Sequence, residues 1–77
     1  MPTVLRIGGL RFFFYSKEGT VPAHTHIEQD DNVAKFWLEP VELASSYGFS
    51  AKDINQIRKL VLEHQTILLQ AWHEYVD

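Results

Sequence analysis

The chain is organised around Pro22-Ala23-His24-Thr25-His26-Ile27-Glu28, an alternating stretch with two imidazoles and a carboxylate at every second position. Successive side chains of a β-strand point to opposite faces, so His24, His26 and Glu28 share one face of a predicted strand. The residues between them face the other way. No other segment of the sequence combines titratable groups with such a fixed geometry, and we therefore expect the chemistry of this protein at this strand.

Short segments rich in β-branched and aromatic residues lie on both sides of this stretch. Gly8-Gly9 supplies the positive φ values of a two-residue turn, and Asp30-Asp31 lies in a polar turn, so each pair predicts a hairpin. Pro40 cannot donate a ladder hydrogen bond, and a short edge strand or extended segment is predicted after it. We expect strands at residues 4–7, 10–15, 23–29, 33–38 and 41–44, followed by a loop at 45–49.

A long helix is predicted over residues 50–76. Ser50 is the expected N-cap, with Asp53 three residues later in place of the usual glutamate of a capping box. Apolar residues then recur at helical spacing and form one buried stripe: Ile54, Ile57, Val61, Leu68, Trp72 and Tyr75. At 1.5 Å per residue, about 24 residues extend roughly 36 Å. Because this length exceeds the width of a four-stranded sheet, part of the helix is expected to overhang the sheet or to bend.

These elements predict a single α+β domain over residues 1–77. A small, mostly antiparallel sheet of four or five strands within residues 1–44 is packed on one face by the long C-terminal helix. Hydrophobic residues make up 45% of the chain and aromatic residues 13%, which is enough for a packed core. A chain of this length buries only roughly 60% of its unfolded surface, so a spacious internal pocket is not expected.

Composition also indicates the compartment and the partners. The chain has no cysteine, which fits a reducing cytosol, and it lacks the pattern of a signal peptide or a membrane helix. We therefore expect a soluble, cytoplasmic protein with no membrane partner. The formal net charge is −3 with histidine neutral, so the composition provides no overall electrostatic attraction to nucleic acid.

Five motifs spread over nearly the whole chain carry a family resemblance: Met1-Pro2-Thr3-Val4-Leu5-Arg6-Ile7, Arg11-Phe12-Phe13-Phe14-Tyr15-Ser16, Pro22-Ala23-His24-Thr25-His26, Ala34-Lys35-Phe36-Trp37-Leu38 and Ala71-Trp72-His73-Glu74-Tyr75. Together they resemble a bacterial family known as domain of unknown function 4160. The chain departs from the family pattern where Ala23 replaces a second proline and Thr25 replaces an apolar residue. These two differences change the residues that lead into the predicted strand, but both histidines are still present.

The resemblance implies no assigned activity, but it does imply a genetic setting. Genes of the family resemble small mobile modules beside a second small gene, which implies a toxin and antitoxin pair. The layout is also similar to toxins with a double-stranded-RNA-binding-like fold, some of which use a strand histidine. By this analogy we expect a toxin-like protein that acts on RNA, with a small cognate protein as its partner.

The histidine strand itself predicts a metal-independent ribonuclease that needs no cofactor. Imidazoles at alternate strand positions lie roughly 6.5–7 Å apart along the backbone, which suits an acid and a base on either side of a phosphodiester. One imidazole would remove the 2′-hydroxyl proton while the other, protonated, donates to the leaving oxygen. Nearby cations would stabilise the phosphorane, and an indole would stack a base. The predicted site comprises His24, His26 and Lys35 as catalytic groups and Arg11, Lys17, Glu28 and Trp37 as binding groups.

Metal binding is one alternative function of the same strand. His24 and His26 would bind a divalent metal ion if Glu28, His64 or His73 completed a tetrahedral shell. Without a metal, His64 on the apolar helix stripe is expected to be packed and hydrogen-bonded. His73 is then expected at the surface near the helix C-terminus, where a cation suits the helix dipole.

A noncatalytic interaction module is the other alternative, either as a protein-binding domain or as an antitoxin-like partner. The predicted edge at residues 41–44 would pair with a partner strand, or the long helix would mediate homo-oligomerisation. Aromatic side chains would then anchor the interface, namely Phe14, Trp37 and those of residues 72–75. Replacing both histidines separates this alternative from catalysis.

Overall fold

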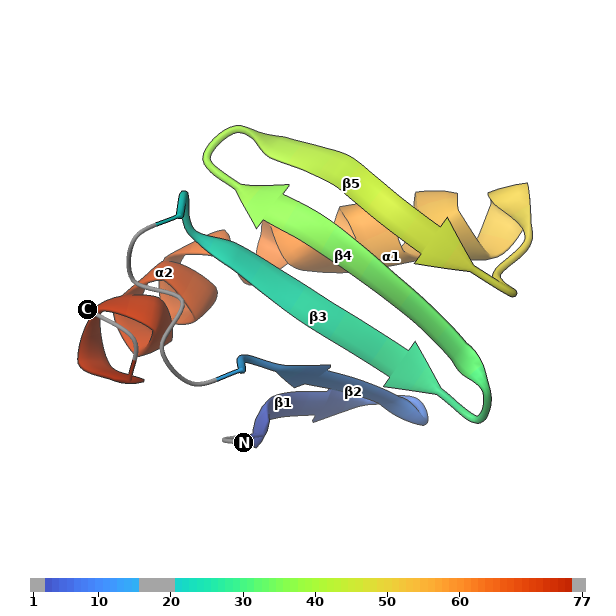
Figure 1. The fold of residues 1–77 in the computed structure, drawn as a ribbon, viewed down its shortest axis with the longest axis horizontal. Coiled ribbons are helices and arrows are strands. Elements are labelled where there is room, and N and C mark those ends of the chain that lie inside the picture. Colours follow the sequence, from blue (N-terminus) through green and yellow to red (C-terminus); the bar gives the residue numbers. More distant parts are fainter. Residues whose placement is uncertain (1–2, 16–20, 76–77) are drawn as a thin grey trace.

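The sheet is a five-stranded antiparallel meander in the computed structural model, which describes residues 3–15 and 21–75. The strands are β1 (Thr3–Ile7), β2 (Leu10–Phe13), β3 (His24–Gln29), β4 (Asn32–Leu38) and β5 (Val41–Tyr47). Each strand pairs with its neighbour in the sequence, so the spatial order is β1-β2-β3-β4-β5 (Figure 1). The α+β fold predicted from the sequence, with a small antiparallel sheet and C-terminal helical packing, is confirmed.

The two predicted hairpin turns are present because their residues accept left-handed backbone conformations. Gly8 and Gly9 have φ values of 51° and 85° between β1 and β2. Asp30, between β3 and β4, has a φ of 55°, a conformation that aspartate tolerates better than most residues. These turns set the register that aligns His26 of β3 with Lys35 of β4.

Strand β5 is longer than predicted, and residues 45–47 continue the ladder. Ser45 pairs with Lys35 and Leu43 pairs with Phe36, so Ala44 is an extra residue that forms a bulge. The bulge shifts the alternation of side chains by one position. The prediction of a loop from residue 45 was wrong because the strand pattern is out of phase on the two sides of this bulge.

The predicted single helix over residues 50–76 is two helices, α1 (Ala51–Glu63) and α2 (Gln65–Tyr75). The capping box is confirmed, since Ser50 Oγ accepts from the Asp53 N–H and the Asp53 carboxylate accepts from the Ser50 N–H. The helices separate at His64, whose Nδ1 donates to the carbonyl of Leu60 at 2.8 Å. The expectation of a bend is therefore met by a break at one residue.

Both helices pack on one face of the sheet, here called the inner face, and among the described residues most of the opposite outer face has no helix over it (Figure 1). Helix α1 runs behind β4 and β5, and α2 lies near the start of β3. The buried core consists of Leu10, Phe12, Ile27, Ala34, Phe36, Leu38, Ile54, Ile57, Val61 and Leu68. A smaller cluster contains Phe14, Ala71 and Trp72. No helix of the described residues is long and apolar enough to cross a membrane.

Candidate functional site

The outer face brings together six of the seven residues predicted as a site. Residues paired across neighbouring strands share a face, and the pairs here are Arg11 with Glu28, His26 with Lys35 and His24 with Trp37. The seventh residue, Lys17, lies outside the described residues. One strand pattern therefore located most of the candidate side chains on one surface.

His24 lies on the predicted face but is completely buried, at 0% exposure. Its ring centroid lies 4.9 Å from that of Trp72 in α2 and 5.6 Å from that of Trp37. Its Nδ1 lies 2.9 Å from the carbonyl oxygen of Pro22, and because a carbonyl only accepts, Nδ1 is the donor. His24 was predicted as one of two catalytic imidazoles on this face, but it does not reach solvent with His26, because Trp72 covers this end of the strand.

His26 is half-buried and lies between aromatic rings. Phe13 stacks on its imidazole at 5.5 Å between centroids, and Tyr15 meets it edge-on at 4.6 Å. The His24 ring lies behind it at 5.0 Å, nearly perpendicular. Nε2 of His26 is buried, while the residue as a whole is half-buried. The neighbouring rings hold the imidazole in one orientation.

A hollow of about 380 Å³ opens beside His26 and is here called the His26 hollow. Phenolic, hydroxyl and ammonium groups stand within a mainly apolar lining. Tyr15 and Tyr47 at its margins are 43% and 73% exposed. The lining residues are Phe13, Tyr15, His26, Ile27, Val33, Ala34, Lys35, Ser45, Ser46 and Tyr47.

Of the ten lining residues, only His26 and Lys35 were predicted as site residues; Tyr15, Ser45 and Tyr47 are among the polar ones that were missed. The alternation of residues 11–15 places Tyr15 on the same face as Phe13, so a signal for Tyr15 was present in the sequence. Ser45 and Tyr47 were missed because the bulge at Ala44 interrupts the pattern of β5.

Lys35 is held at the side of the His26 hollow by an aromatic ring. Its Nζ lies 4.6 Å from the ring centroid of Trp37, two residues along β4. A cation over an indole face is stabilised by the ring quadrupole. Lys35 is also the cross-strand partner of His26, so its ammonium and the imidazole project from neighbouring positions of the outer face.

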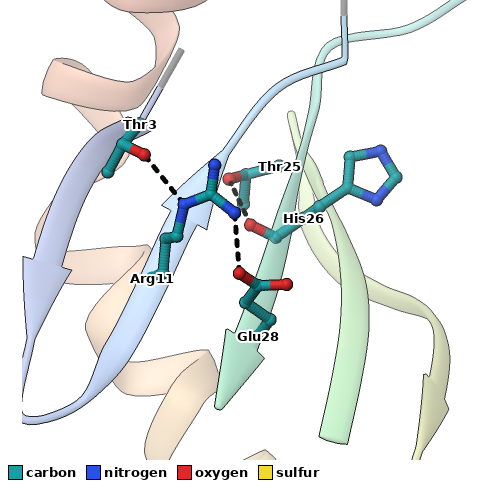
Figure 2. A network of polar contacts seen from close by, with 5 residues as sticks. All are labelled: Thr3, Arg11, Thr25, His26 and Glu28. Carbon is teal, nitrogen blue, oxygen red and sulfur yellow. Dashed lines mark hydrogen bonds and ion pairs between the residues drawn. The ribbon is translucent and has the colours of Figure 1, made fainter. Parts of the chain in front are cut away.

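Arg11 and Glu28 form an ion pair with each other, at 2.6 Å between Nη1 and Oε1 (Figure 2). Arg11 Nε also donates to Thr3 Oγ1 at 2.8 Å, and its guanidinium lies 4.4 Å from the centroid of the Phe13 ring. In Figure 2 the His26 ring points away from this network. Arg11 and Glu28 therefore belong to a second site beside β1, distinct from the His26 hollow.

The other two histidines lie on the helices, at the positions expected without a metal. His64 is half-buried and hydrogen-bonded at the end of α1, and His73 is exposed in the last turn of α2. Within residues 3–15 and 21–75, no group of three or more histidine, aspartate or glutamate residues gathers where it could hold a metal ion. The third ligand required by the metal-binding alternative is thus not found in this part of the chain.

One family model, described as Domain of unknown function (DUF4160), matches residues 9–73. The matched segment begins in the turn before β2 and ends within α2, so it includes both histidines of β3 and the strands around them. No curated protein and no solved structure matches the chain.

Proposed function

The chain belongs to the DUF4160 family, which has no assigned activity, and from the outer face we propose that it binds and cleaves single-stranded RNA as the toxin-like component of a toxin–antitoxin module. The observation that carries this proposal is the His26 hollow, where an oriented imidazole and the ammonium of Lys35 lie on the sheet face opposite the main helical packing, beside two exposed phenols. Open sheet faces with aromatic side chains are typical platforms for single-stranded RNA.

Base stacking provides the binding energy in this proposal. Tyr15 and Tyr47 are exposed and line the His26 hollow, and stacking of a base on an aromatic ring contributes about 1–3 kcal/mol. The volume of about 380 Å³ falls in the range of small-ligand sites, roughly 300–1,000 Å³. One nucleobase in the hollow would place its sugar and phosphate beside His26 and Lys35.

The cleavage step uses one accessible imidazole in place of the predicted pair, because His24 is buried. The neutral imidazole of His26 accepts the 2′-hydroxyl proton, and the 2′-oxygen attacks the adjacent phosphorus. The bond to the 5′-oxygen breaks, which leaves a 2′,3′-cyclic phosphate, and the ammonium of Lys35 donates a proton to the leaving oxygen. His24 acts as a positioning residue whose ring supports that of His26.

Local charge favours this face over the rest of the molecule. The described outer-face strand positions carry three cations, Arg6, Arg11 and Lys35, against two carboxylates, Glu28 and Glu42. The whole chain has a formal net charge of −3. The described strand positions of the outer face are thus mildly positive while the rest of the chain is negative, and this polarity would orient an RNA strand towards the sheet.

The test compares three proteins, the native chain and the variants His26→Asn and His73→Asn. Each is assayed for cleavage of a labelled single-stranded RNA in the presence of EDTA. The last variant makes the same substitution at an exposed histidine of α2. We expect His26→Asn to lower the cleavage rate at least about a hundredfold, the lower range of general acid–base catalysis. RNA binding by His26→Asn and cleavage by His73→Asn should remain near native values.

Two results would contradict the proposal. Equal cleavage by the two histidine variants would remove His26 from the mechanism. No RNA binding by the native protein would leave the noncatalytic alternative, a protein-binding or antitoxin-like domain. Growth arrest on induced expression of the native chain, with no arrest by His26→Asn, would support the toxin-like role.

A further inference from the structure

A second hollow on the outer face lies at the β1 edge of the sheet, and we propose that it binds a phosphate group between Arg6 and Arg11. Its volume is about 390 Å³ and it shares no residue with the His26 hollow. The lining residues are Thr3, Arg6, Gly9, Arg11, Glu28, Gln29 and Asp30. This site stands on its own geometry and does not depend on RNA cleavage.

The two arginines are direct cross-strand partners, Arg6 on β1 and Arg11 on β2. Like charges directly opposite each other destabilise a sheet, and an anion between them relieves that repulsion. Arg6 is exposed and makes no ion pair with any residue of the described ranges. Its guanidinium is therefore accessible to a ligand from solvent.

Arg11 is preorganised by three partners that leave part of its guanidinium for a ligand (Figure 2). Glu28 accepts from Nη1, Thr3 accepts from Nε, and the Phe13 ring supports the guanidinium plane. Nη2 carries two further N–H groups, which make no hydrogen bond to the described part of the chain. Because the side chain is already ordered, binding an anion costs little additional conformational entropy.

Phosphate is the anion that this arrangement suits. The planar fork of a guanidinium donates two parallel hydrogen bonds to phosphate oxygens, and two guanidiniums can hold different oxygens of one group. Asp30 lies at the margin of the same hollow and Glu28 already pairs with Arg11. These two carboxylates offset the two cations, so we expect weak binding, with a Kd of order 1 mM.

The test is a titration of the isotope-labelled protein with inorganic phosphate at constant ionic strength, followed by NMR at the Arg11 Nε–H and the Gly9 amide. Saturable shifts are expected. Arg6→Gln should raise the Kd about tenfold, the effect of losing one charge-assisted contact. Lys59→Gln removes the same charge from the exposed surface of α1 and should change the Kd less than about twofold.

Replacing a carboxylate tests whether negative charge in this hollow weakens phosphate binding. Asp30→Asn keeps a side chain that tolerates the φ of 55° and removes a repulsive charge, so it should lower the Kd about threefold. Non-saturable shifts in the native protein, or equal changes in Arg6→Gln and Lys59→Gln, would overturn the proposal. Folding of each variant is read from the same spectra.

A second experiment, the binding of a single-stranded RNA, distinguishes a nucleic-acid phosphate from a free phosphate compound as the ligand. If Arg6→Gln weakens binding of a single-stranded RNA as well as inorganic phosphate, the site holds a backbone phosphate. If only phosphate binding is lost, the ligand is a free phosphate compound. His26→Asn should leave the phosphate titration unchanged, so failure of the ribonuclease proposal and failure of this one give different results.

Discussion

His24 and His26 are two residues apart on one strand and have different physical roles. His24 is enclosed by Trp37, Trp72 and the carbonyl of Pro22, whereas His26 reaches the outer face. A buried imidazole that packs against two indoles contributes to stability through both its ring and its hydrogen bond. The accessible imidazole is the one that can meet a substrate.

We expect His24→Ala to lower the free energy of unfolding by about 2–4 kcal/mol, because it removes a buried ring and leaves a cavity. His26→Ala should cost less than about half as much, since its side chain is only partly buried. Urea unfolding followed by tryptophan fluorescence measures both. Equal losses would show that the two histidines contribute equally to packing.

The sequence predicted which face His24 occupies, but not its burial. Alternation along β3 is a local property, and it correctly placed both imidazoles on one side of the sheet. Burial depends on Trp72, which comes from the last helix and covers the beginning of β3 through tertiary packing. Tyr47 was missed for a related reason, since its position depends on a bulge in its own strand.

At the scale of elements, the junction between α1 and α2 determines where Trp72 lies. Gln65, the first residue of α2, donates from Nε2 to the carbonyl of Leu38 at 2.6 Å. Leu38 is the last residue of β4, so this bond ties the second helix to the end of the sheet. The break at His64 turns α2 towards this contact.

Gln65→Leu keeps most of the side-chain volume and removes the donor to Leu38. We expect a loss of about 1–2 kcal/mol, the cost of a part-buried carbonyl without its hydrogen bond. Gln70→Leu makes the same substitution at an exposed position of α2 and should change stability by less than about 0.5 kcal/mol. Thermal unfolding of both variants measures the difference, and equal effects would exclude the tether.

The start of α1 was predictable and its end was not. Ser50 and Asp53 form a cap through contacts within four residues, which a sequence pattern captures. The apolar stripe continues on both sides of His64, so periodicity alone predicts one helix. Directly after the break, Gln65 donates to a carbonyl of β4, a tertiary contact that the local pattern does not encode.

At the scale of the whole molecule, charge segregation determines how RNA binding should respond to salt. The described outer-face strand positions carry three cations, and one of them, Arg11, already pairs with Glu28. Each phosphate neutralised on single-stranded nucleic acid contributes about −0.7 to the slope of log K against log salt. We therefore expect a shallow slope, of about −1 to −2.

This dependence is measured by fluorescence anisotropy of a labelled RNA at salt concentrations from about 50 to 200 mM. Lys35→Met should reduce the magnitude of the slope by about 0.7. A slope near zero would contradict contact with the phosphate backbone. A slope steeper than about −4 would require cations beyond the described outer face.

The sequential order of the strands has a consequence for synthesis of the chain. Every strand pairs with its sequence neighbour, so the sheet can assemble hairpin by hairpin as the polypeptide leaves the ribosome. Both helices follow β5 in the chain, and they supply the side chains that seal the apolar inner face. The apolar inner face of the sheet therefore stays exposed during translation until the two helices emerge, and a nascent chain at this stage is more prone to aggregation than the folded protein.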